Sequence, residues 1–102
     1  MTVKEFLKET YKPIDTMLKV RPRIVCADGF SISIQASVLN YCTPKENLEN
    51  GEYTTVELGY PSEEDELIKE YKETYSSKIY PYVPIEVVGI LIEKHGGMMG
   101  IQ

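Results

Sequence analysis

The sequence predicts one α+β domain, and three observations lead to that class. An Asp-Gly pair lies between two apolar-rich runs, which favours an antiparallel sheet centred on a β-hairpin over about residues 23–37. Residues 53–60 alternate polar and apolar side chains, as a further strand of that sheet would. Apolar residues at helical spacing predict a helical N-terminal segment over 1–20 and two C-terminal helices. With 102 residues the chain can build one modest core, so we expect a single domain over 1–102.

The N-terminal segment begins with a capping-box pattern, in which the Thr2 hydroxyl accepts from the first turn while Glu5 reaches back. Pro13 cannot lie inside a helix, because its ring collides with the carbonyl of Glu9. We therefore expect two short helices, the second opening at Pro13. The apolar stripe of this segment consists of Val3, Phe6, Leu7, Tyr11, Ile14 and Leu18.

The hairpin is predicted to reverse at Asp28 and Gly29, because both central residues of the tight turn need a positive φ. That turn would place Val25 opposite Ile32, and a slip of one residue would exchange the two faces. The apolar face would carry Val25, Ala27, Phe30, Ile32, Ile34 and Ala36. The opposite face would carry Ile24, Cys26, Ser31, Ser33, Gln35 and Ser37.

The second half of the chain begins with a long loop over 38–52, ahead of the strand at 53–60. Ser62 is then expected to cap a helix with an acidic first turn and a buried stripe of Leu67, Ile68, Tyr71 and Tyr75. Prolines around residues 76–83 favour extended backbone and a short edge strand. Pro84 suits the first position of a last helix, which Gly96 would close; the 96–102 tail is either frayed or docked.

Charge is distributed unevenly along the chain, although the net charge is −5. Residues 1–45 contain seven Lys and Arg and four acidic residues, whereas residues 46–102 contain four Lys and Arg and twelve acidic residues. This asymmetry indicates either one anion-attracting surface or simply the solvated faces of helices. No apolar run is long enough to cross a bilayer, so we expect no membrane association. Two cysteines without an export signal favour reduced thiols in a cytoplasm.

Catalytic and metal motifs are sparse. The single histidine, His95, has no neighbouring ligand pattern for a metal, and we expect no cofactor. Cys26 or Cys42 could pair with His95 for nucleophilic catalysis, and structural roles are the alternative reading of all three. The acidic run at residues 63–66 fits a solvated helix start better than a cation site.

A ligand site is predicted on the polar face of the hairpin. Short hydrogen-bonding groups on a rigid sheet, with guanidinium groups and a phenol ring beside them, suit a nucleotide or phosphate. The alternative is that this face is only the solvent side of a half-exposed sheet. The candidate ligand-binding residues are Arg21, Arg23, Ser31, Ser33, Gln35 and Tyr41.

Several blocks of the sequence resemble small uncharacterised proteins encoded by phages and prophages of gut-dwelling Gram-positive bacteria. The longest block is Arg-Pro-Arg-Ile-Val-Cys-Ala-Asp-Gly-Phe-Ser-Ile-Ser-Ile-Gln-Ala-Ser at 21–37, followed by Tyr-Cys-Thr-Pro at 41–44. Shorter blocks at 55–62, 80–84 and 94–97 are similar to later parts of the same group. The resemblance covers about residues 21–97 and includes no established catalytic motif.

The resemblance implies a small accessory protein made in the cytoplasm of an infected bacterial host, of a kind that often antagonises host immunity. Together with the polar face, this leads us to expect a non-catalytic, homo-oligomeric protein that sequesters a nucleotide-type immune signal, such as a cyclic nucleotide or an ADP-ribose derivative. The alternative is an inhibitor of a host immune nuclease that uses acidic residues 46–73 as a nucleic-acid mimic. A small enzyme built on Cys26, Cys42 or His95 is the third hypothesis.

Overall fold

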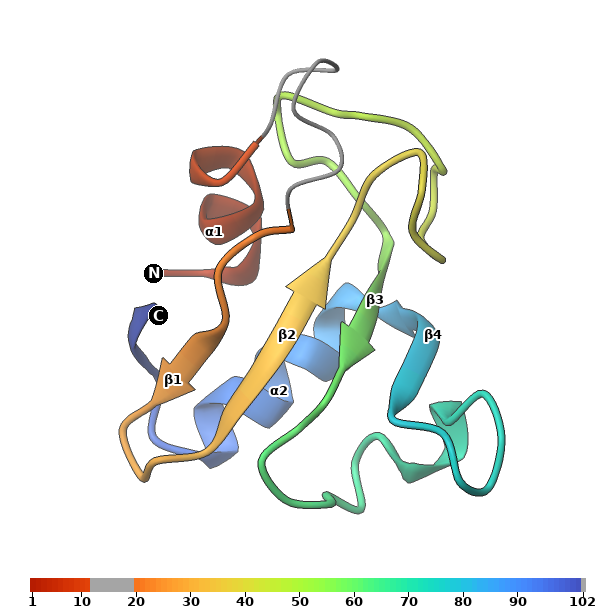
Figure 1. Ribbon diagram of the computed structural model, residues 1–102. Helices are drawn as coiled ribbons and strands as arrows, with labels where there is room; N and C mark the ends of the chain where they lie inside the picture. The colour runs from red at the N-terminus through yellow and green to blue at the C-terminus, as the bar shows by residue number, and fades with distance from the viewer. Residues whose placement is uncertain (12–19, 102) are drawn as a thin grey trace.

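The computed structural model describes residues 1–11 and 20–101, and its fold is α+β (Figure 1). Five antiparallel strands form one sheet in the order β4-β3-β2-β1-β5. The predicted class and the antiparallel sheet are confirmed. The elements are α1 (Val3–Glu9), β1 (Ile24–Cys26), β2 (Ser31–Gln35), β3 (Thr55–Gly59), the 3₁₀ turn η2 (Lys69–Tyr71), β4 (Ile79–Pro84), α2 (Ile85–Lys94) and β5 (Met98–Ile101).

The core lies between the sheet and the helices, with α2 crossing behind β2 and β3 in Figure 1. Alternate residues of the central strands face it, because side chains of a strand point to opposite sides of the sheet. Each fully buried aliphatic or phenyl side chain contributes about 1.5–3 kcal/mol by leaving water. The central members are Phe6, Leu7, Ile32, Ile34, Val56, Leu58, Val83, Val88 and Leu91.

The hairpin forms where it was predicted, but its register is shifted by one residue. Val25 lies opposite Ser31 and not Ile32. The loop has three residues, because the Cys26 amide donates to the Phe30 carbonyl at 2.7 Å and Gly29 takes a φ of +95°. A left-handed glycine at the third loop position adds one residue to the reversal.

This shift inverts the predicted faces of β1. Ile24 and Cys26 face the core, whereas Val25 is only partly buried and Ala27 is exposed. The faces of β2 are as predicted, with Ile32 and Ile34 in the core.

The capping-box start predicted for the N-terminal helix is confirmed, whereas the last helix begins one residue after Pro84. The Thr2 hydroxyl accepts from the Glu5 amide at 3.1 Å, and the Glu5 carboxylate accepts from the Thr2 amide at 2.7 Å. Pro84 precedes α2 as its N-cap, one position before the place predicted for it. The second N-terminal helix, predicted to open at Pro13, lies outside the described residues.

The predicted helix after Ser62 is wrong, because this segment contains only the 3₁₀ turn η2. The polar side chains that could cap a helix here form other hydrogen bonds instead. The Ser62 hydroxyl accepts from the Ser31 amide at 2.9 Å, and Asp65 accepts from the Leu67 amide at 2.9 Å. Such side chain–backbone bonds compete with helix formation. Tyr75 is consequently exposed and not part of a buried stripe.

The two edge strands carry irregularities that hinder further pairing. In β5, which docks the C-terminal tail on β1, Met99 is the extra residue between the pairs Cys26↔Met98 and Val25↔Gly100. In β4, Pro81 and Tyr82 both lie across from Glu57. Bulges and prolines at sheet edges discourage the addition of another strand.

Replacing Gly96 by alanine should destabilise the protein by about 2 kcal/mol, because its φ is +92° and a Cβ atom would lie 2.8 Å from the Ala27 Cβ. Gly100→Ala is the matched control, since an added Cβ there meets nothing within 4 Å. Urea unfolding of both variants measures the difference. Equal stability of the two would contradict the close packing of α2 against the hairpin loop.

Candidate functional site

The predicted ligand residues on β2 lie on the face of the sheet turned away from α2, here called the outer face. Ser31 and Ser33 are partly buried there, and Gln35 is buried. Ser33 pairs with Gly59 and Gln35 with Glu57 on the neighbouring strand. The outer face is therefore a row of short polar groups with one carboxylate beside it.

Arg21 is a structural residue in this fold. Its buried guanidinium donates to the Leu7 carbonyl at 3.1 Å, to the Thr10 hydroxyl at 2.9 Å and to the Ala36 carbonyl. Gln35 holds the Arg21 backbone, accepting from its amide at 2.9 Å and donating to its carbonyl at 3.0 Å. These two predicted ligand residues join α1 to β2, so their polar groups already have partners inside the protein.

Arg23 is also engaged, although less deeply. Its guanidinium donates to the Ser31 hydroxyl at 2.9 Å, to the Ser31 carbonyl at 3.1 Å and to the Tyr60 carbonyl. Tyr60 has a φ of +50°, so Arg23 stabilises a left-handed residue at the end of β3. Arg23 and Ser31 thus lie together in a contact that fastens one loop of the sheet.

Tyr41 lies beside the outer face in an exposed group that we call the tyrosine surface, formed by Tyr41, Lys45 and Tyr82. The two rings are 5.9 Å apart between centroids at 47°, and the Lys45 ammonium is 5.1 Å from the Tyr41 ring centroid. The Tyr41 amide donates to Glu57 at 2.9 Å, and its carbonyl accepts from the Tyr82 amide at 3.1 Å. Glu57 therefore links this surface to the outer face.

Tyr82 and Glu57 are not among the candidate residues that the sequence indicates. Tyr82 has a φ of +53° at the β4 bulge, which turns its ring towards the loop that carries Tyr41. Bulges re-aim side chains in this way. The prolines at 81 and 84 signalled an edge strand, but no local pattern in the sequence reports a bulge opposite one particular residue.

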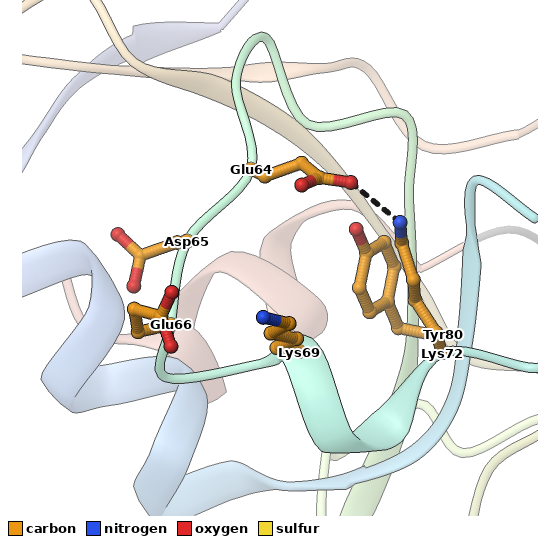
Figure 2. A pocket seen from close by; sticks show the side chains of 6 residues that line it. All are labelled: Glu64, Asp65, Glu66, Lys69, Lys72 and Tyr80. Atoms are coloured by element: carbon orange, nitrogen blue, oxygen red, sulfur yellow. Dashed lines mark hydrogen bonds and ion pairs between the residues drawn. The ribbon is translucent and has the colours of Figure 1, made fainter. Parts of the chain in front are cut away.

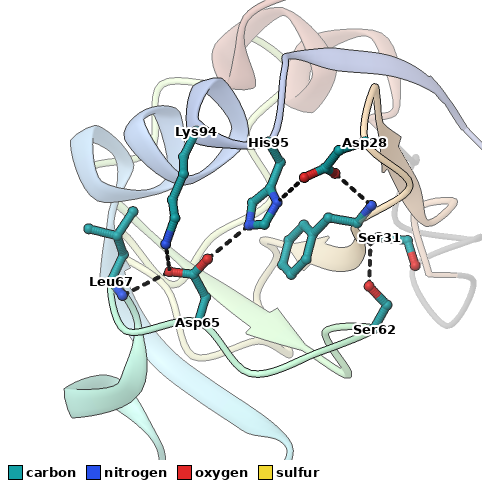
Figure 3. Close-up of polar contacts among 8 residues, drawn as sticks. Asp28, Ser31, Ser62, Asp65, Leu67, Lys94 and His95 are labelled. Carbon is teal, nitrogen blue, oxygen red and sulfur yellow. Dashed lines mark hydrogen bonds and ion pairs between the residues drawn. The ribbon is translucent and has the colours of Figure 1, made fainter.

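His95 lies at the centre of a buried polar cluster that joins three segments (Figure 3). Its Nδ1 is 2.7 Å from the Asp28 carboxylate and its Nε2 is 2.8 Å from the Asp65 carboxylate. The Phe30 ring stacks on the imidazole, with centroids 4.0 Å apart and planes at 9°. Lys94 adds a second cation, 3.0 Å from Asp65. We call this arrangement the His95 clamp.

Electrostatics favour a charged imidazolium in the clamp. Burial disfavours the charge, but the hydrogen bonds to Asp28 and Asp65 outweigh it and raise the pKa of His95. The pKa of Asp65 is lowered against its own burial by bonds from Leu67, His95 and Lys94. In the charged form both ring nitrogens carry a proton, and each donates it to the carboxylate that it faces.

The thiols have environments that suppress nucleophilicity. Burial raises the pKa of Cys26, as does the charge of Asp28, and burial raises the pKa of Cys42. A protonated thiol is a poor nucleophile. With both nitrogens of His95 bonded to carboxylates, the described geometry offers no cysteine–histidine pair. In residues 1–11 and 20–101, no three His, Cys, Asp or Glu side chains come together as a metal site would require.

Comparison with known proteins identifies no relative that could indicate a function. No protein-family model, no curated protein and no solved structure matches this chain. Within the described residues, no helix has the length and apolar character that crossing a membrane requires.

The His95 clamp predicts a pH-dependent stability. The contribution of His95 is fully present below its unfolded pKa of 6.5 and is lost as the pH rises through the raised folded pKa. The contribution of Asp65 is present above 3.8 and is lost as the pH falls through its lowered folded pKa. The clamp is therefore strongest between these values, and urea unfolding from pH 4 to 9 should show a decline on the alkaline side.

The control variant is His95→Gln, which should cost about 2 kcal/mol at pH 6 because buried Asp65 loses a charged partner. It should also remove the alkaline decline, since His95 is the only histidine of the chain. An unchanged decline in this variant would show that another group causes it.

Proposed function

We propose that this protein binds a nucleotide-type small molecule without transforming it, on the tyrosine surface and the adjoining outer face of the sheet. The observation that carries this proposal is the geometry of Tyr41 and Tyr82. The two exposed rings lie side by side because Tyr82 holds a left-handed backbone and Tyr41 is hydrogen-bonded through both its amide and its carbonyl. A left-handed non-glycine residue costs about 1–2 kcal/mol, and such strain concentrates at functional sites.

Each group at this surface suits one part of a nucleotide. Exposed phenol rings stack on bases, which is worth about 1–3 kcal/mol per base. The Lys45 ammonium can neutralise a phosphate at the same edge. The carboxylate of Glu57 can accept from ribose hydroxyls or exocyclic amines, and the Ser33 hydroxyl lies on the same face. Arg21 and Gln35 support the sheet beneath this site and do not contact the ligand.

The biological role follows from the resemblance to phage-encoded proteins. A protein that binds without catalysis, made in the cytoplasm of an infected host, would lower the free concentration of an immune signal. Cyclic nucleotides and ADP-ribose derivatives are the ligands that we propose to test first. Since both sheet edges carry bulges, the homo-oligomer that belongs to this proposal would form through other surfaces.

Isothermal titration with cyclic nucleotides, cyclic dinucleotides and ADP-ribose derivatives tests the ligand class. We expect saturable binding of at least one, weakened at least tenfold by Tyr82→Asn, because this variant removes a stacking ring. Asparagine tolerates left-handed backbone, so the fold should keep its stability to within about 0.5 kcal/mol. The matched control is Tyr75→Asn, at a tyrosine that is 97% exposed and lies outside the tyrosine surface. Absence of binding throughout the series would refute the proposal.

A second candidate function is inhibition of a host immune nuclease through an acidic surface. The observation that favours it is that Glu63, Glu66, Glu70 and Glu73 are exposed, while Arg21 and Arg23 are engaged inside the fold. The exposed charge around the irregular segment after β3 is therefore largely negative and could face a basic nucleic-acid groove.

Charge reversal separates this function from ligand binding. Glu63→Lys with Glu66→Lys should abolish inhibition of a susceptible nuclease and leave nucleotide binding unchanged. The control pair Glu86→Lys and Glu93→Lys makes the same charge change on α2, where both acids are also exposed. Equal inhibition by both pairs and the unaltered protein would exclude the acidic segment as the contact.

A further inference from the structure

A cavity outside the tyrosine surface lies between the segment after β3, the turn η2 and the start of β4 (Figure 2). It consists of a small hollow of about 70 Å³ and a wider one of about 280 Å³. Glu64, Lys72 and Tyr80 line both hollows. The small hollow exceeds the roughly 30 Å³ that one water occupies in the liquid, so it can hold a compact polyatomic group.

Tyr80 gives this cavity an unusual polar group. The residue is only 2% exposed, and its hydroxyl takes part in no hydrogen bond among the described residues. No fully buried side-chain oxygen or nitrogen of the described chain lacks a partner, so the hydroxyl is reached by solvent through the cavity. Burial raises the pKa of Tyr80, which keeps the phenol protonated as a donor. An anchored donor that faces the cavity and bonds to no other described residue can donate to a ligand oxygen there in place of water.

Lys72 and Glu64 occupy the same cavity as an ion pair, with the ammonium 2.5 Å from the carboxylate oxygen. The two side chains differ in anchoring, because Lys72 is 21% exposed and Glu64 is 76% exposed. Lys72 is thus part of the wall, whereas Glu64 reaches in from the solvent side. A single exposed ion pair contributes little to stability, so an external anion can replace Glu64 at small cost.

The surroundings favour negative charge at the position of the Glu64 carboxylate. The hydrogen bond from Lys72 lowers the pKa of Glu64, as do the charges of Lys72, Lys69 and Lys78. Besides Glu64, two acids line the small hollow. Asp65 opposes an anion only weakly, because its carboxylate is paired with Lys94 and His95 (Figure 3), and Glu66 is exposed to solvent, which screens its charge. Figure 2 shows the Lys69 and Lys72 side chains on the same cavity as the Tyr80 phenol.

We propose that this cavity binds the terminal phosphate of a small phosphomonoester, which takes the place of the Glu64 carboxylate. The phosphate accepts from the Lys72 ammonium and the Tyr80 hydroxyl in the small hollow, and the rest of the molecule lies in the wider one. A phosphate monoester is a dianion with three free oxygens, so it gains more from several donors than a monoanionic carboxylate does. Glu64 acts as a resident counter-ion that competes with the ligand. This site is independent of the tyrosine surface.

Titration with inorganic phosphate and with a sugar phosphate, followed by calorimetry and by NMR of the lysine ammonium groups, tests the proposal. We expect Lys72→Met to weaken phosphate binding at least tenfold, since a charged hydrogen bond is lost. Tyr80→Phe should weaken it about three- to tenfold while keeping the ring in place. Glu64→Gln should strengthen it several-fold, because the competing charge is gone.

The matched control is Glu70→Gln, which removes an exposed acid of η2 that lines neither hollow and makes no bond to Lys72. It should change phosphate affinity less than Glu64→Gln, and Tyr82→Asn should not change it at all. Thermal unfolding confirms that each variant is folded. Absence of saturable phosphate binding even in Glu64→Gln, equal affinity for acetate and phosphate, or equal effects of the two glutamate variants would each overturn the proposal.

Discussion

A buried imidazole with a carboxylate bonded at each ring nitrogen holds this fold together. His95 ends α2, Asp28 lies in the hairpin loop and Asp65 lies in the irregular segment after β3, so one side chain fixes three segments that are distant in sequence. The close approach of Gly96 to Ala27 and the stacking of Phe30 on the imidazole reinforce the same junction. Removing one partner of a buried ionic group leaves the others uncompensated, which makes such a junction cooperative. The position of Asp65 in turn sets where Glu64 can reach, so the clamp also shapes the cavity beside Lys72.

Some polar residues on the outer face stabilise the fold, and others are free to contact a ligand. The hydrogen-bond partners of each side chain distinguish the two kinds. Arg21 and Gln35 look like ligand residues by type, yet Arg21 donates to the carbonyls of Leu7 and Ala36, and Gln35 holds the backbone of Arg21. Tyr41 and Tyr82 have backbone groups engaged and rings exposed, which is the reverse arrangement. Tyr80 combines a buried ring with a hydroxyl that has no partner among the described residues. The groups available to a ligand are therefore mainly tyrosines and lysines at the loops and the β4 edge, and the arginines serve the fold.

The predictions that held concern elements whose signals are local. The capping box of Thr2 and Glu5, the alternation of β2 and β3 and the glycine that closes α2 each depend on neighbouring residues alone. The predicted helix after Ser62 failed because Ser62 and Asp65 find partners in β2 and α2, which no local pattern reveals. The register of the hairpin was missed by one residue because an Asp-Gly pair is compatible with two loop lengths, and packing of Ile24 and Cys26 in the core accompanies the longer one.

Local patterns in the sequence were enough to predict the class of the fold, the central hairpin, the capping-box start of α1 and the polar face of β2. Each of these follows from periodicity and capping, which act over a few residues. Which polar groups remain available for binding depends instead on how distant segments pack against one another. The pairing of Tyr41 with Tyr82, the ion pair of Glu64 with Lys72 and the isolation of the Tyr80 hydroxyl each join residues from different elements. Hydrogen bonding and burial between distant segments are set by the packed chain as a whole, so no stretch of sequence encodes them separately.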